Sequence, residues 1–260
     1  MKIYSCEIRG QAASLDAYLN EYHIYSSDGA SHGYSTSLLP WMERQNVFRI
    51  QVAASAKAKE GAPVKFSVAA TVEEDSRSQT LVRMSFPEGI APPDVASLPF
   101  DTSDKHLTAG HNLGFVCEDE RDIVEKPWKT TPKTITEPGE IFRLYAEIQR
   151  LFIEGNVDQL MGLSRARISF GAKLCGQSRV DYEKDVHDDL RSTLAGRPQW
   201  RSVQNPDREL TVHEFLPSKV VRVLNLQGNP PLRTVPDADG IRFGYDVILA
   251  MTSGGLVWIM

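Results

Sequence analysis

The residues of this sequence that could bind a metal ion gather in two short segments. His106 and His111 lie five residues apart, with Gly110 beside the second histidine. On a helix this spacing puts the two side chains about 140° apart, whereas the helical zinc motif uses positions i and i+4. We therefore expect the pair to lie in a loop without a metal. Residues 185–189 (DVHDD) offer carboxylates and an imidazole, but a divalent cation would need further oxygen ligands from elsewhere in the chain.

Motifs for nucleotide binding and acyl transfer do not occur in the sequence. Neither G-x-x-x-x-G-K-[ST] nor G-x-G-x-x-G is found, so no glycine loop is evident for phosphates. The G-x-S-x-G motif of serine hydrolases is missing too. Cys6, Cys117 and Cys175 are widely spaced and form no C-x-x-C pair, which argues against a zinc knuckle or a dithiol site. We expect reduced thiols, no cofactor and no stoichiometric metal.

Acid–base catalysis would require polar side chains that face a cavity. The candidates for such positions in the second half are Tyr145, His213, Tyr245 and Asp246. A general base also needs a partner and a pocket. Neither can be identified around His213, which we interpret as a histidine of a sheet. No catalytic residue is assigned.

Two acidic segments are the best candidates for binding a partner. Residues 118–125 and 181–189 each contain five acidic residues and one basic residue. On a helix at 100° per residue, the four aspartates of the second segment fall within about a quarter turn. Aspartate is a poor residue for a helix interior, and like charges four residues apart are slightly destabilising. The candidate partner-binding residues are Glu118, Asp119, Glu120, Asp181, Asp185, Asp188 and Asp189.

The same aspartates have a second interpretation. Tyr182, Val186, Leu190 and Leu194 form an apolar stripe beside them, so the segment also fits an amphipathic helix with a solvated outer face. Both interpretations require a helix at 179–195, which begins after Ser178 and ends before Pro198.

The first half of the chain is predicted to be rich in β-strands. Apolar residues alternate with polar ones in 47–54 and 64–73, which predicts two antiparallel strands joined as a hairpin by 57–63. Residues 79–86 are predicted to form a third strand, and 2–9 and 113–117 two short ones. Residues 87–112 are rich in Pro, Gly, Asp and Ser and are predicted to form a long loop.

Between the first strand and the hairpin we expect a helix and a loop. Leu15, Tyr18, Leu19 and Tyr22 recur at helical spacing, which favours a helix over 14–25. The small polar residues of 26–37 then favour a loop.

The second half is predicted to consist of helices followed by strands. Three prolines make 126–138 a candidate linker. An apolar stripe from Ile141 to Phe152 predicts a helix over 139–154, and a short helix is expected at 157–164. The remaining strands are predicted at 209–216, 219–227, 241–251 and 255–260, with the first helix packed on them.

Together these elements predict an α+β fold with two parts. The first, 1–125, is an antiparallel β-rich domain. A linker over 126–138 leads to 139–260, where helices pack on a curved antiparallel sheet. The order of elements in 137–260, with the Gly155-Asn156 turn after the first helix, resembles the nuclear-transport-factor-2-like cone fold. That fold hosts enzymes, ligand carriers and interaction modules, so it does not imply one function.

Composition restricts the class of protein. The 260 residues carry a net charge of 29 − 34 = −5, which argues against a nucleic-acid or anionic-membrane binder. The N-terminus lacks the apolar core of a signal peptide, and no apolar run approaches a membrane span. We therefore expect a cytoplasmic protein.

Overall character, rather than a motif, suggests a function. In size, cytosolic composition and lack of catalytic motifs, the chain resembles immunity proteins, which neutralise bacterial toxins such as type VI secretion effectors by direct binding. Acidic immunity proteins suit nuclease toxins, whose substrate channels must be positive. The partner would be a cognate toxin, and a homodimer is possible. The alternatives are a small-molecule-binding or enzymatic cone-fold domain and a structural component without a ligand.

Overall fold

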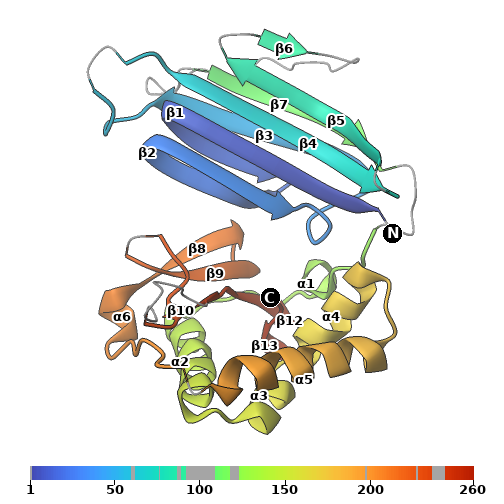
Figure 1. Cartoon of the computed structure of the whole chain (residues 1–260), viewed down its shortest axis with the longest axis vertical. Coiled ribbons are helices and arrows are strands. Elements are labelled where there is room, and N and C mark those ends of the chain that lie inside the picture. The colour runs from blue at the N-terminus through green and yellow to red at the C-terminus, as the bar shows by residue number, and fades with distance from the viewer. Residues whose placement is uncertain are drawn as a thin grey trace. The chain divides into compact units, whose positions relative to one another are not determined.

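The computed structural model describes residues 2–59, 62–75, 77–86, 89–91, 109–117, 123–196, 198–226, 228–235 and 244–260. The chain divides into two compact units, Met1–Val124 and Glu125–Met260. The first unit contains strands and the second contains helices with strands (Figure 1), which confirms the α+β class. Each unit is described by itself below.

In its described residues, the first unit forms one antiparallel sheet of seven strands. They are β1 (Ile3–Leu19), β2 (Tyr22–Ser37), β3 (Gln45–Ala54), β4 (Lys65–Glu74), β5 (Arg77–Phe86), β6 (Gly89–Ala91) and β7 (Ala109–Val116). The strands predicted at 47–54, 64–73 and 79–86 are confirmed as β3, β4 and β5. Most of the predicted loop at 87–112 lies outside the described residues, but β6 and the start of β7 fall within it.

The long strand β1 organises this sheet. Its first half, Ile3–Gln11, pairs with β4, and its second half, Ala13–Leu19, pairs with β3. Along its other edge β1 pairs with β2. The prediction that β3 and β4 form a hairpin with each other is therefore wrong. Alternation identified both strands correctly, but it carries no information about which partner each strand takes.

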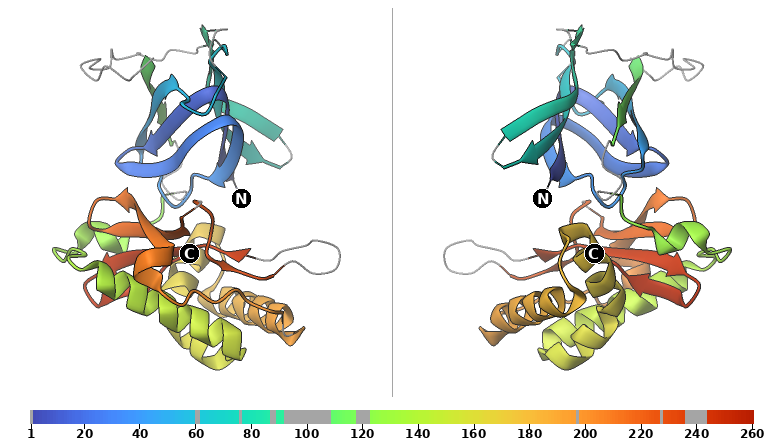
Figure 2. Two further views of the ribbon diagram at one scale, coloured as in Figure 1. Left: turned by 90° about the vertical axis from the view of Figure 1, so that its left-hand side faces the viewer. Right: turned by 90° about the vertical axis from the view of Figure 1, so that its right-hand side faces the viewer.

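The change of partner coincides with a fold in β1. Ala12 has a positive φ of 51°, a left-handed conformation that is uncommon outside glycine. Before it, the buried side chains are at even positions such as Cys6 and Ile8, and after it they are at odd positions such as Leu15 and Ala17. This switch lets both halves bury their apolar side chains on the same side, and the sheet curls into a half-barrel (Figure 2).

The predicted helix at 14–25 is wrong, because these residues form the ends of β1 and β2 and the turn between them. Leu15 and Leu19 are four residues apart, a spacing that fits one face of a helix and also one face of a strand. Tertiary pairing with β2 and β3 selects the strand. Asn20, with a φ of 56°, makes the tight turn, and its Oδ1 accepts a 2.9 Å hydrogen bond from the Val47 backbone N–H.

The predicted loop at 26–37 is also wrong, since it belongs to β2. The segment has few apolar residues, so the sequence shows no clear alternation. Its backbone is ordered by the ladder to β1, from Ser5 opposite Ser37 to Leu19 opposite Tyr22.

The second unit contains six helices and six strands in its described residues. The helices are α1 (Pro127–Thr130), α2 (Pro138–Glu154), α3 (Val157–Leu163), α4 (Arg165–Cys175), α5 (Arg179–Ala195) and α6 (Pro206–Glu209). The strands are β8 (Leu210–Leu216), β9 (Val220–Asn225), β10 (Leu232–Arg233), β11 (Gly244–Tyr245), β12 (Val247–Thr252) and β13 (Gly255–Trp258). Helices α2, α3 and α5 confirm the predictions at 139–154, 157–164 and 179–195.

Four of these strands form an antiparallel sheet in the order β13-β12-β9-β8. Side chains of α2, including Ile141, Tyr145 and Ile148, share one buried core with Val221 and Val223 of β9. The predicted packing of this helix on the C-terminal strands is confirmed (Figure 1). The strand predicted at 241–251 is divided at Asp246 into β11 and β12, and residues 241–243 lie outside the described part.

Two parts of this unit were not predicted from the sequence as helices. Residues 166–178 contain most of α4, which ends at Gly176 in a left-handed conformation with φ of 62°. The segment 126–138, predicted as a linker, contains α1, whose Trp128 is fully buried with its ring 5.0 Å from that of Phe170. Among the described helices, none combines the length and the apolar character that a membrane span requires.

Candidate functional site

Helix α5 carries the four aspartates that the sequence singles out in the second half. Its N-cap is Ser178, whose Oγ accepts a 3.2 Å hydrogen bond from the Asp181 N–H. Val186, Leu190 and Leu194 are buried against the core, as the periodicity predicts. The aspartates lie off this stripe and are exposed, so α5 presents an acidic surface next to a fixed apolar one. We call Asp181, Asp185, Asp188 and Asp189 the acidic face.

Three carboxylates of the acidic face are oriented by neighbouring side chains. Asp181 Oδ2 accepts a 2.6 Å hydrogen bond from the Ser178 hydroxyl, and Asp185 Oδ2 accepts one of 3.2 Å from Gln177 Nε2. Asp189 Oδ2 accepts a 2.8 Å hydrogen bond from the Tyr245 hydroxyl. Within the described residues, no lysine or arginine forms an ion pair with any of the four. The one basic side chain of the described residues that contacts them is His187, whose Nδ1 lies 3.4 Å from Asp188 Oδ1. Their negative charge is therefore available to a partner.

The Tyr245 hydroxyl connects α5 to the strands. Because its proton goes to Asp189, the hydroxyl oxygen accepts from Thr193 Oγ1 at 3.3 Å. Burial raises the pKa of Tyr245, and the Asp189 carboxylate raises it further. Tyr245 is therefore a neutral hydrogen-bond donor at physiological pH, and it holds Asp189 in place.

Beneath the acidic face lies an aromatic centre that the sequence did not indicate. Phe152 is 4.9 Å from the rings of both Trp200 and Tyr245, and 6.4 Å from that of Trp258. The guanidinium of Arg167 lies 5.0 Å from the Trp258 ring and 5.8 Å from the Tyr245 ring. The aromatic centre therefore joins residues from α2, α4, the segment after α5, and strands β11 and β13.

Two donors of the aromatic centre are buried without a hydrogen-bond partner among the described residues. They are Arg167 Nη1 and Trp200 Nε1. Buried polar groups in folded proteins nearly always have a partner. Both groups can only donate, so a partner for either would have to be a hydrogen-bond acceptor.

The four acid–base candidates are not brought together. Tyr145 is fully buried in the core, where its hydroxyl accepts a 3.5 Å hydrogen bond from Gln149. His213 pairs across strands with Arg222, which alternates with the core residues Val221 and Val223. His213 therefore faces away from the helices, and its interpretation as an inward-facing candidate is wrong. Alternation along β9 decides this.

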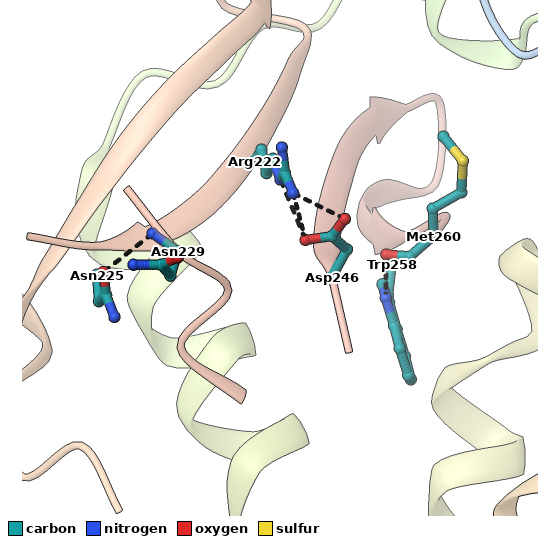
Figure 3. A network of polar contacts seen from close by, with 6 residues as sticks. All are labelled: Arg222, Asn225, Asn229, Asp246, Trp258 and Met260. Atoms are coloured by element: carbon teal, nitrogen blue, oxygen red, sulfur yellow. Dashed lines mark hydrogen bonds and ion pairs between the residues drawn. The ribbon is translucent and has the colours of Figure 1, made fainter. Parts of the chain in front are cut away.

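Asp246 is also directed away from the core. Its carboxylate accepts from the guanidinium of Arg222, at 3.1 Å from Nε and at 2.7 and 2.8 Å from Nη2 (Figure 3). Such a bidentate pair fixes the strands β9 and β12 relative to each other. The same figure shows Trp258 donating to the Met260 carbonyl, which anchors the C-terminus.

The remaining sequence candidates are placed as follows. Glu118, Asp119 and Glu120 lie outside the described residues, as does His106. His111 belongs to β7. Among the described residues, no group of three or more His, Cys, Asp or Glu side chains is arranged to hold a metal ion.

The three cysteines are free thiols. Cys6 and Cys117 are buried, and Cys175 is partly exposed. Burial raises the pKa of both Cys6 and Cys175.

Comparison with known proteins gives this arrangement no counterpart: neither a protein-family model, nor a curated protein, nor a solved structure matches the chain.

Proposed function

We propose that this chain is a protein-binding protein that neutralises a cognate bacterial toxin by direct contact, as immunity proteins do. The observation that carries the proposal is the acidic face of α5, whose exposed carboxylates form no ion pair with a lysine or arginine among the described residues; Asp188 alone contacts a histidine, His187, at 3.4 Å. A toxin with a positive substrate channel, such as a nuclease, is the partner that this charge suits.

Orientation of the carboxylates supports binding rather than general solubility. Hydrogen bonds from Gln177, Ser178 and Tyr245 restrict the side chains of Asp185, Asp181 and Asp189. Side chains that are already ordered lose less conformational entropy when a partner binds. Opposed charges also accelerate encounter and suppress wrong partners.

Charge reversal on the acidic face tests the proposal. Asp185→Lys should weaken binding to the product of the neighbouring gene by about tenfold or more, equivalent to about 1.4 kcal/mol. Asp185 is preferred to Asp189, because Asp185 bonds, in the described part of the chain, only to the exposed Gln177 near its own helix, whereas changing Asp189 would remove the hydrogen bond from Tyr245 that links α5 to β11. The matched control is Glu147→Lys, an equal charge change at an exposed position of α2.

Titration calorimetry at two salt concentrations provides the measurement. Wild type and Glu147→Lys should bind with similar affinity, and salt should weaken both. Asp185→Lys should bind more weakly and with a smaller dependence on salt. Equal affinities for the two variants would remove the acidic face from the mechanism.

The aromatic centre favours a second candidate function, the binding of a small ligand. No acceptor from the described residues reaches Arg167 Nη1 or Trp200 Nε1, so the ligand class would be a small carboxylate or another oxygen-rich anion. Thermal shift with a panel of such anions tests this candidate. Arg167→Met, which keeps an unbranched side chain but removes the donors, should abolish any shift.

A further inference from the structure

Among the described residues, β2 pairs with β1 alone, and no strand pairs with its outer edge. The register of the β1–β2 ladder, with Ser5 opposite Ser37, places Tyr4 opposite Leu38. The Leu38 backbone N–H donates a 2.9 Å hydrogen bond to the Tyr4 carbonyl. Bonded and non-bonded pairs alternate in an antiparallel ladder, so even-numbered residues of this part of β2 bond to β1. Ser31, Gly33 and Ser35 then direct their N–H and C=O groups away from β1, and no backbone partner meets them in the described part of the chain.

The segment Ser31–Ser37 lacks the features that usually protect an edge. It reads SHGYSTS, with no charged residue and no proline, and its odd-numbered residues are exposed. Natural edge strands carry lysines, prolines or bulges, or are very short. By contrast, β13 has four residues, and β8 carries Glu214 next to a register shift. The register shift of β2 lies opposite Ala17 and Tyr18, outside this segment.

We infer that two copies of this chain associate by antiparallel pairing of Ser31–Ser37, related by a two-fold axis beside Tyr34. In this register Ser31 lies opposite Ser37 of the second copy, and Gly33 lies opposite Ser35. These odd-numbered pairs are the ones whose N–H and C=O groups point outward in both copies, so each pair exchanges two backbone hydrogen bonds. The contact is isologous and closed, as in most dimers.

Charge favours a second copy as the occupant of this edge. The whole chain carries a net charge of −5, so two copies repel each other at most of their surface. The segment Ser31–Ser37 is uncharged, so it does not attract a strongly charged partner. When the same segment of a second copy pairs with it, no like charges are brought together. The same segment of a second copy is also uncharged and can pair with this edge in register. We therefore take a second copy as the occupant of the edge.

Side chains along the edge permit the approach. Gly33 and Ser35 are small, so they leave the neighbouring backbone accessible. Tyr34 is already ordered by stacking on Tyr25, with ring centroids 4.8 Å apart. In the dimer the two copies of Tyr34 would face each other across the strands, an aromatic pair of the kind that stabilises sheets.

Proline substitution at Ser35 tests the inference. Ser35→Pro removes an outward N–H without removing a hydrogen bond to β1, and Ser35→Ala keeps that N–H. Sedimentation velocity of the full chain should show a mass that rises toward the dimer with concentration for wild type and Ser35→Ala. Ser35→Pro should stay monomeric. Ser35→Lys should stay monomeric too, because it places a positive charge on both paired strands. Circular dichroism and melting confirm that both variants are folded.

Cross-linking tests the register. Tyr34→Cys in a Cys175→Ser background should form a covalent dimer on mild oxidation, because the two-fold axis brings the two Cα atoms to about 4.5 Å. Thr36→Cys in the same background should not, since Thr36 lies opposite His32 of the second copy. A wild-type protein that is monomeric at every concentration, a dimer that Ser35→Pro leaves intact, or equal cross-linking of the two cysteine variants would overturn the inference.

Discussion

Replacement of Gly171 by alanine measures how closely α4 and α5 pack. A Cβ atom at this buried position would lie 2.4 Å from Cζ and from the hydroxyl oxygen of Tyr182 on α5. That distance is far below van der Waals contact, so the ring would have to move. Overpacking of this kind costs about 1–3 kcal/mol. Alanine also gains about 1 kcal/mol of helix propensity over glycine.

The packing cost should exceed the propensity gain. We expect Gly171→Ala to lower the free energy of unfolding by about 1 kcal/mol, which corresponds to about 2–4 °C in Tm. Gly162 is the matched control, because it is exposed on α3 and an added Cβ would meet nothing within 4 Å. Gly162→Ala should therefore stabilise the protein by about 0.5–1 kcal/mol.

Urea unfolding of both variants, with the slope m checked for constancy, provides the measurement. A double-mutant cycle then isolates the contact: in a Tyr182→Ala background, Gly171→Ala should become stabilising, as Gly162→Ala is. If Gly171→Ala stabilises the protein while Tyr182 is intact, the close approach of the two helices is refuted.

Three further changes test other contacts. Asp246→Ala should lower the free energy of unfolding by about 1–2 kcal/mol, because the guanidinium of Arg222 loses its bidentate partner. The Arg222 side chain is only 17% exposed, so water replaces that partner poorly. Urea unfolding measures the change, and an unchanged midpoint would contradict the prediction. The raised pKa of Tyr245 means that the unfolded chain loses this proton first as pH rises above the ordinary value of 10.0, so stability falls there. Tyr245→Phe should make that alkaline decline in the free energy of unfolding shallower, and an identical slope would argue against the burial of the Tyr245 hydroxyl and its contact with Asp189. A thiol reagent should modify at most Cys175 in the native protein and all three cysteines in denaturant; fast modification of three native thiols would contradict the burial.

The sequence alone determined those elements whose hydrophobic period is local. Residues within one segment are enough to predict the apolar stripe of α2, the caps and stripe of α5, and the alternation in β3 and β4. The exposed positions of the aspartates on α5 follow in the same way, since the apolar stripe fixes which side of the helix is buried.

Tertiary structure decided what depends on residues far apart in the chain. Leu15 and Leu19 fit a helix and a strand equally well, and only the ladders to β2 and β3 select the strand. The same holds for the partners of β3 and β4, because alternation specifies a face and not a neighbour.

The sites show the same division. The acidic residues of α5 are visible in the sequence, but the hydrogen bond from Tyr245 to Asp189 joins residues 56 positions apart. The aromatic centre gathers Phe152, Arg167 and Trp258 from three elements with no shared motif. Side-chain chemistry and local periodicity are properties of the sequence, whereas contacts between distant segments depend on how the core closes around them.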